Sequence, residues 1–342
     1  MAGERRPEAP LALSMGEPAG VGPELALALW SARGARRTPP FVAVGDPGVF
    51  ASRAALLGID LPLAETEPEA APALFPDRFP IYPVGAPCRA EPGRASVEDA
   101  ASVIAAIRES VELVHGGRCS ALVTLPIAKA PLVESGFPHP GHTEYLGALA
   151  ESLWGAPSRA VMLLWSEALA VVPVTVHIPL AEVPVRLTED AIVETARIVA
   201  ADLRDRFGVQ APRLAVAGLN PHAGENGVLG HEDEAIVAPA VRRLQAEGID
   251  AHGPLPADTM FHAAARARYD VALAMYHDQA LIPVKTLAFD TAVNATLGLP
   301  FVRTSPDHGT AFDIAGSGTG DPGSLLAALR LAQRLTGGPA SA

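Results

Sequence analysis

Three histidines, His177, His222 and His277, each follow an apolar run that predicts a buried strand. In open α/β sheets, ligands bind outside the carboxyl ends of the strands, so three imidazoles at three such ends can converge on one point. Neutral nitrogen ligands with an open position suit a catalytic divalent metal such as zinc, cobalt or nickel. A lone histidine more often bonds a backbone group, but three in equivalent positions favour metal or substrate binding.

A second set of polar side chains suits an anion. Lys285 and Arg303 flank Asn294 between apolar runs, and His142 and Thr143 stand at an expected helix start. An ammonium, a guanidinium, an imidazole and a hydroxyl near a helix N-terminus can hold a phosphate or a carboxylate. Each residue alone is more often an ordinary surface or capping residue, and only their combination predicts an anion site.

Three further features have less specific meanings. Lys129 and Lys285 are the only lysines among 26 basic residues, and both lie in motif-like stretches. Residues 15–23 form a Gly-rich turn between a strand and a helix, which is either an anion-friendly corner or a tight turn. Its spacing is not the GxGxxG of a Rossmann fold. The pair Asp307 and His308 has no role that the sequence assigns.

Composition narrows the class of protein. The chain has 342 residues, 49% of them apolar, which is enough for a sizeable core. The net charge of −12, without a basic run, makes nucleic acid and anionic membranes poor partners. Cys88 and Cys119 belong to no paired motif, and no apolar run reaches the length of a membrane helix or a signal segment. We therefore expect a cytoplasmic protein.

Short strand patterns alternate with helical patterns along the chain, which predicts an α/β fold with helices on the faces of a sheet. The Pro-, Ala- and Glu-rich segment 62–94 is expected to be an irregular excursion. The expected strands are 11–14, 41–44, 121–124, 161–165, 168–176, 214–219 and 271–275. The main expected helices are 24–32, a long helix capped by Ser96, 189–207, 233–247 and 324–335.

The motifs as a group resemble those of one enzyme family. They are MGEPAGVGPEL, ALVTLPIAK, GHTEYL, VHIPL, GLNPHAGENG, GPLPADTMF, AMYHDQALIPVK and VNATLGLPFVRTSPDHGTAFDIAG. So many ordered blocks over about 300 residues are far more specific than any single motif. The sequence resembles the 4-hydroxythreonine-4-phosphate dehydrogenase family of pyridoxal phosphate biosynthesis.

The resemblance implies a three-layer α/β/α fold like that of isocitrate and isopropylmalate dehydrogenases, in two subdomains with a cleft. Residues 10–338 would form one catalytic unit of two interleaved subdomains, 10–130 with 305–338, and 131–304. It further implies a homodimer with the site near the subunit interface, and NAD or NADP as cofactor. We expect cofactor contacts from the loop after Val216 and from the 294–318 region, at Gly218, Asn220, Asn294 and Gly316.

The resemblance also implies roles for the residues singled out above. A divalent metal, zinc, cobalt, magnesium or nickel, would be held by the three histidines. Substrate contacts would come from His142, Thr143, Lys285, Asn294 and Arg303.

The implied reaction oxidises 4-phosphohydroxy-L-threonine at C3 and then decarboxylates it to 3-amino-2-oxopropyl phosphate. Lys285 is the candidate proton acceptor or anion clamp, and Asp258 or Asp278 would relay a proton or orient a ligand. Related members of the superfamily act on D-erythronate or D-threonate 4-phosphate, or on a cis-dihydrodiol dicarboxylate, and fold alone does not choose among them. A three-histidine metallohydrolase and a non-catalytic metal- or anion-binding protein are the rival hypotheses.

Overall fold

The computed structural model describes residues 9–337, and contacts divide the chain into two compact units. Within the described residues, unit 1 contains residues 9–160 and 299–337, and unit 2 contains residues 161–298. These bounds differ from the expected ones, which lay near 130 and 304. The reason is packing, because Leu132 and Leu146 share one hydrophobic core with Leu122 and Phe301 and therefore belong to unit 1.

Unit 1 is built on six parallel strands in the order β3-β4-β2-β1-β5-β12. The central strands β1 and β2 are buried along their whole length, as expected for a parallel sheet covered on both faces. The strands are β1 (Leu11–Ser14), β2 (Phe41–Gly45), β3 (Leu63–Glu65), β4 (Phe79–Pro83), β5 (Leu122–Thr124) and β12 (Arg303–Pro306).

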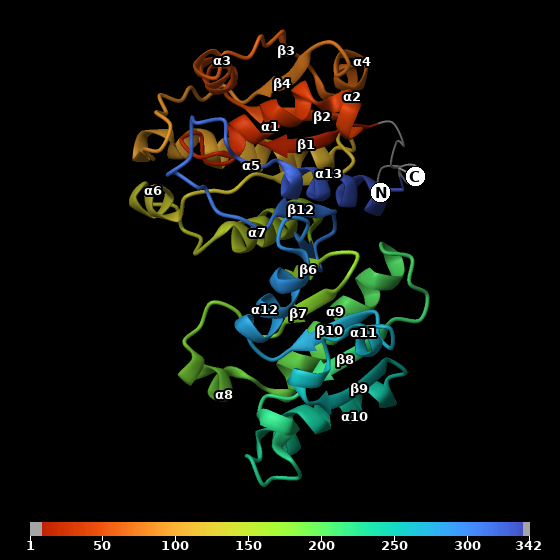
Figure 1. Ribbon diagram of the computed structural model, residues 1–342. Coiled ribbons are helices and arrows are strands. Elements are labelled where there is room, and N and C mark those ends of the chain that lie inside the picture. The colour runs from red at the N-terminus through yellow and green to blue at the C-terminus, as the bar shows by residue number, and fades with distance from the viewer. Residues whose placement is uncertain (1–8, 338–342) are drawn as a thin grey trace. The chain divides into compact units, whose positions relative to one another are not determined.

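The helices of unit 1 pack on this sheet and on one another. Helix α5 contacts β1, β2 and β5, while α13 contacts β12 and α1 (Figure 1). The α-helices are α1 (Gly22–Ser31), α2 (Arg33–Arg36), α3 (Pro47–Leu56), α4 (Ala71–Leu74), α5 (Ala100–His115), α6 (Lys129–Glu134), α7 (His142–Trp154) and α13 (Gly323–Leu335). Two 3-10 turns, η1 (Pro68–Ala70) and η2 (Val97–Asp99), precede α4 and α5. The expected cap is present, because the Ser96 side chain accepts the Glu98 N–H at 3.2 Å.

Unit 2 has a mixed sheet in the order β11-β6-β7-β10-β8-β9. Strands β7, β10, β8 and β9 run parallel, whereas β6 pairs antiparallel with both β7 and β11. The strands are β6 (Val161–Trp165), β7 (Ala170–Pro173), β8 (Arg213–Ala217), β9 (Asp250–Leu255), β10 (Val271–Ala274) and β11 (Val293–Leu297).

Helices and turns of unit 2 follow the strands closely. Helix α12 packs on β7 and β10, and α10 packs on β9 and α9 (Figure 1). The α-helices are α8 (Val183–Arg186), α9 (Glu189–Asp205), α10 (Ala238–Ala246), α11 (Ala263–Arg266) and α12 (His277–Ala288). The shorter turns are η3 (Leu180–Glu182), η4 (Pro221–Gly224), η6 (Ala257–Thr259) and η5 (Asp233–Val237), the last with π-helical hydrogen bonding.

The predicted α/β class is confirmed, and each expected strand has a counterpart in the structure. The prediction of an irregular segment over 62–94 was wrong for its first part. Residues 63–65 and 79–83 form β3 and β4, which pair parallel to each other and join β2. Pro80 and Pro83 hid β4 in the sequence, because proline is unfavourable inside a sheet.

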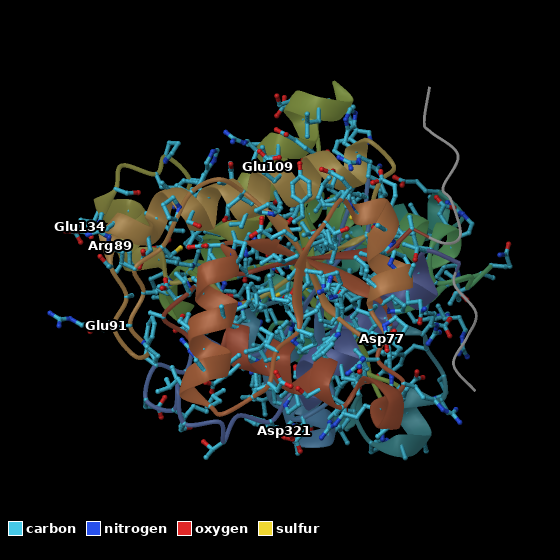
Figure 2. The ribbon with its side chains drawn as sticks, turned by 90° about the horizontal axis from the view of Figure 1, so that it is seen from above. Asp77, Arg89, Glu91, Glu109, Glu134 and Asp321 are labelled. Carbon is cyan, nitrogen blue, oxygen red and sulfur yellow. The ribbon has the colours of Figure 1, made fainter. Side chains whose placement is uncertain are left out.

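Charged side chains lie on the outside of unit 1, and Figure 2 shows Glu91, Glu134 and Asp321 at the edge of the view. Within residues 9–337, no helix has the length and apolar character needed to cross a membrane.

A buried ion pair ties together the loops at one end of the unit 1 sheet. Arg53 Nη1 lies 3.2 Å from Glu24 Oε2, and both side chains are 2% exposed. Arg53 also donates to the carbonyls of Gly20 and Pro18, while Glu24 accepts the Gly316 N–H at 2.7 Å. The pair therefore connects two helices to the Gly-rich loop and to the loop that precedes α13.

We predict that Arg53→Met lowers the free energy of unfolding by about 3–5 kcal/mol, because it leaves the Glu24 carboxylate buried without its cation. Urea denaturation measures the change. The matched control is Arg108→Met, which breaks an exposed pair with Glu112 and should cost at most about 1 kcal/mol. Equal losses for the two variants would contradict the structural role of the buried pair.

Candidate functional site

The three histidines of the sequence analysis follow three neighbouring strands of unit 2. Strand β10 lies between β7 and β8 and pairs parallel with each. Adjacent strands lie about 4.7–4.9 Å apart, so their carboxyl ends share one edge of the sheet. His177, His277 and His222 come three to five residues after the ends of β7, β10 and β8.

Two of the three imidazoles lie against each other. The ring centroids of His177 and His277 are 5.5 Å apart, at an interplanar angle of 44°. Both rings line a cavity of about 260 Å³, together with Thr175, Tyr276 and Asp278. His277 Nδ1 is 2.7 Å from Asp278 Oδ1, a contact of the kind that orients an imidazole. Among residues 9–337, no three His, Cys, Asp or Glu side chains are grouped so that they could hold a metal ion.

His222 lies in η4, a turn with unusual backbone geometry. Its φ is +53°, and that of His177 is +50°. Non-glycine residues rarely adopt this left-handed region, and such strain is concentrated at functional sites. The buried Asp233 carboxylate holds the turn by accepting the N–H groups of Leu219 and Asn220 at 2.6 and 2.9 Å.

Two of the proposed cofactor residues, Gly218 and Asn220, lie between the end of β8 and this turn. A Cβ on Gly218 would lie 2.8 Å from Cα of Ala223, so only glycine fits there. The Asn220 side chain donates to Glu232 Oε2 at 2.8 Å. Both residues therefore have a structural role in this turn, in addition to the proposed cofactor contact.

The other candidate site residues of unit 2 are Asp258, Lys285 and Asn294. Asp258 is exposed in η6, which packs beside η4 and so lies near the turn that carries His222. Lys285 stands eight residues after His277 in α12, about 12 Å along the helix axis. Its ammonium is 5.8 Å from the ring centroid of Phe289. Asn294 is half-buried in β11.

Unit 1 holds the remaining anion-binding candidates. Arg303 begins β12, is 6% exposed and donates from Nε and Nη2 to Thr124 Oγ1 at 3.2 and 2.7 Å. Burial lowers the pKa of Arg303 to about 10. His142 begins α7 with Thr143 next to it, and the His142 Nε2 atom is shielded from solvent without a hydrogen-bond partner among the described residues.

A second shielded imidazole nitrogen lies in the loop after β12. His308 Nδ1 is 2.9 Å from the Gly309 carbonyl oxygen, and Nε2 is buried without a hydrogen-bond partner in the described part of the chain. The same loop leads to Gly316, whose φ is +83° and whose N–H is bound by Glu24. A buried polar atom without a partner is rare and marks a place where a ligand or an ion can bind.

Sequence reasoning missed the residues that hold these loops, chiefly Asp233, Gln279 and Thr124. Gln279 lies in the motif that contains His277, and the sequence assigns it no role. Their one visible signal is a polar residue adjoining an apolar strand pattern, and that signal does not identify a hydrogen-bond partner far away in the sequence.

Comparisons with known proteins agree along nearly the whole chain. Residues 37–332 match the family described as "Pyridoxal phosphate biosynthetic protein PdxA". The chain is 58% identical to "4-hydroxythreonine-4-phosphate dehydrogenase" of Methylorubrum populi, over 97% of this chain and 96% of that protein.

Solved structures give the same result. A crystal structure of 4-hydroxythreonine-4-phosphate dehydrogenase from Klebsiella pneumoniae is 37% identical, with a TM-score of 0.84, and the match covers 96% of this chain and 99% of that one. A terephthalate 1,2-cis-dihydrodiol dehydrogenase from Burkholderia xenovorans is 28% identical, with a TM-score of 0.63 and coverage of 95% and 98%.

The ring of His142 gives a prediction about pH. Its pKa is lowered well below the ordinary 6.5, first because burial disfavours the charged ring and then because Arg303 repels it. Below about pH 6.5 the unfolded chain binds a proton at this residue and the folded chain does not. The free energy of unfolding should therefore fall with decreasing pH, by up to about 1.4 kcal/mol per pH unit from this group.

His142→Gln removes this contribution, so urea denaturation should show a shallower loss of stability for the variant between pH 6.5 and 5.5. Between pH 7.5 and 8.5 the two proteins should have parallel profiles, which serves as the internal control. Identical slopes on the acid side would show that His142 is not held neutral in the fold.

Proposed function

The chain belongs to the PdxA family and is an oxidoreductase of the 4-hydroxythreonine-4-phosphate dehydrogenase type, and from this premise we propose that it oxidises 4-phosphohydroxy-L-threonine at C3 with NAD. The proposed product loses carbon dioxide to give 3-amino-2-oxopropyl phosphate, a precursor in pyridoxine 5′-phosphate biosynthesis. The main support in the structure is the placement of three histidines after three adjacent strands in unit 2.

In this proposal His177, His222 and His277 hold a divalent metal, because neutral imidazoles are suitable donors. Among residues 9–337 of this structure the three side chains are not grouped around one point. Neutral imidazoles suit zinc, cobalt or nickel better than magnesium, which prefers oxygen ligands. A bound metal would lower the pKa of the substrate's C3 hydroxyl and stabilise the enolate formed on decarboxylation. Asp278 would orient His277 through the 2.7 Å contact at Nδ1.

Candidate contacts for the substrate phosphate occur in each unit. In unit 1, Arg303 supplies a buried cation and His142 a shielded nitrogen, with Thr143 beside it in the first turn of α7. A neutral imidazole can donate one N–H to a phosphate oxygen. In unit 2, the candidate substrate contacts are Lys285 and Asn294.

Two residues are candidates for the proton acceptor at C3. Lys285 lies about 12 Å along α12 from His277. That separation favours an anion clamp over proton transfer near the histidines. Asp258, in the turn beside η4, is the better placed of the two to receive the proton.

For the dinucleotide, we propose contacts at Gly218, Asn220, Asn294 and Gly316. His308 lies in the loop that leads to Gly316, and its Nε2 atom has no hydrogen-bond partner among residues 9–337, which supports a ligand at that loop. NADP is the alternative cofactor.

The proposal places the enzyme in the cytoplasm as a homodimer with its metal site near the subunit interface. Exposed apolar side chains of unit 2 support the dimer, because large exposed apolar patches mark interaction sites. Val185 and Phe289 are 78% and 73% exposed, and Leu180 and Ile282 are 70% and 64% exposed. Leu180 also lines the cavity that contains His177 and His277.

The activity is tested by the absorbance of NADH at saturating NAD and Co²⁺. We expect turnover of 4-phosphohydroxy-L-threonine, formation of carbon dioxide and little rate without metal. D-erythronate 4-phosphate, D-threonate 4-phosphate and a cis-dihydrodiol dicarboxylate are the competing substrates. Faster turnover of any of these would assign the chain to the sister activity, and no NADH with any of them would refute the proposal.

The dimer is tested by Phe289→Glu, which introduces a charge at the exposed residue that follows α12. Sedimentation velocity should show a shift from dimer to monomer, because a desolvated charge at an apolar interface costs several kcal/mol. Val133→Glu is the matched control, since Val133 is 62% exposed but lies in unit 1. A dimer that persists in Phe289→Glu would place the interface elsewhere.

A further inference from the structure

Thr124 and Arg303 lie on the same face of the unit 1 sheet. Arg303 pairs with Leu122 in the parallel ladder between β12 and β5, and Thr124 is two residues beyond Leu122. Residues two apart in a strand point to the same face of the sheet. Helix α7 covers this face, because Leu122 shares a hydrophobic core with Tyr145 and Leu146. Thr124 and Arg303 are therefore on the side of the sheet to which His142, the first residue of α7, belongs.

The Thr124 hydroxyl accepts two hydrogen bonds from Arg303. The guanidinium donates to Thr124 Oγ1 from Nε at 3.2 Å and from Nη2 at 2.7 Å. Thr124 is fully buried and Arg303 is 6% exposed, so both groups are shielded from water. Because the guanidinium is planar and rigid, two bonds along one of its edges fix its orientation as well as its position.

The same hydroxyl retains one proton that it can donate. A threonine hydroxyl has two lone pairs and one O–H group. Both lone pairs accept from Arg303, so the proton must point away from the guanidinium. Within residues 9–337, the Thr124 side chain makes no hydrogen bond besides these two. A buried donor without an acceptor is unfavourable, so an oxygen atom of a ligand that accepts this proton would gain free energy on binding.

The ring of His142 adds another donor to this part of unit 1. Its Nε2 atom is buried and has no hydrogen-bond partner among the described residues. Burial, and then the positive charge of Arg303, lower the pKa of His142, so the ring is neutral and lies near the guanidinium. A neutral imidazole can donate one N–H. Arg303, Thr124 and His142 therefore present a group of donors that suits an anion with several oxygens, such as a phosphate.

We propose that Thr124 is a further substrate-binding residue, which orients the Arg303 guanidinium and donates its own hydroxyl proton to an oxygen of the substrate phosphate. The inference rests on the proposed role of Arg303 as a phosphate contact. Valine has nearly the same shape as threonine but can neither accept from Arg303 nor donate to an anion. Serine can do both, because it has the same hydroxyl group.

The first measurement is NADH formation by the full-length chain with NAD, Co²⁺ and varied 4-phosphohydroxy-L-threonine. Thr124→Val should raise KM for this substrate by about tenfold or more, because a hydrogen bond to a charged group is lost and Arg303 is no longer held. The kcat and the KM for NAD should change by less than about threefold, since phosphate contacts are the same in the ground state and the transition state.

The second measurement is binding of inorganic phosphate, by titration calorimetry on the full-length chain. Thr124→Val should weaken this binding by a factor similar to the rise in KM. The titration needs no turnover, so it tests Thr124 even if the substrate is a different phosphate ester. A raised KM with parental binding of inorganic phosphate would overturn the assignment of Thr124 to the phosphate.

Two variants serve as controls for packing. Thr124→Ser keeps the hydroxyl, so its KM should stay within about threefold of the parent, whereas a general loss of packing would not be rescued by a smaller side chain. Thr304→Val removes a buried 2.9 Å hydrogen bond from a hydroxyl to the Ala328 carbonyl in the neighbouring strand β12, and its KM should be parental. Circular dichroism checks the fold. Thr124→Ala, for which the same rise in KM is expected, replaces Thr124→Val if that variant unfolds.

Arg303→Met separates the inference from the proposed function. If Arg303→Met binds inorganic phosphate and substrate as the parent does, Arg303 does not hold the phosphate, and the inference fails together with that part of the proposed function. If Arg303→Met weakens both and Thr124→Val weakens neither, the role of Thr124 is wrong and the phosphate contact of Arg303 stands. A rise in KM as large in Thr304→Val or Thr124→Ser as in Thr124→Val would also overturn the inference, because the hydroxyl of Thr124 would then not be its cause.

Discussion

The parallel pairing of β10 with both β7 and β8 is the constraint on which the proposed chemistry of unit 2 depends. Parallel strands end at the same edge, and the residues that follow them must emerge side by side. His177, His222 and His277 are far apart in sequence, and this pairing places the strands that precede them next to one another. Beyond the ends of these strands, the side chains of Thr175 and Gln279 form hydrogen bonds with the peptide groups of Met275, and Gln279 also bonds the Gly218 carbonyl. These bonds link the segments that follow β7, β10 and β8.

In unit 1, buried polar contacts hold loops and side chains in fixed positions. Glu24 and Arg53 tie the Gly-rich loop to the loop that contains Gly316. Arg303 is held against Thr124, so its guanidinium is oriented before any anion arrives. A buried cation that is already oriented loses little conformational entropy on binding, which favours tight recognition of a phosphate.

Strands with a clear apolar pattern in the sequence were predicted correctly, and strands without one were missed. Runs such as Val271 to Met275 are apolar, short and bounded by polar residues, so β10 was predicted within one residue. Strand β4 was missed because two of its five residues are proline, and β9 because Asp250, His252 and Gly253 break any apolar pattern. Such strands form because a neighbouring strand pairs with each of them, and that information is not local.

By itself, the sequence determined the α/β class, the family and the identity of the candidate histidines, because these depend on residue types and on spacing along the chain. Only the tertiary structure decided that β7, β10 and β8 are neighbours, that His177 and His277 share a cavity, and that Gln279 joins two strand ends. The physical reason is that strand order and side-chain hydrogen bonds between distant segments arise from packing of the whole unit. Local pattern can place a histidine at a strand end, but only the packed sheet determines which strand ends meet.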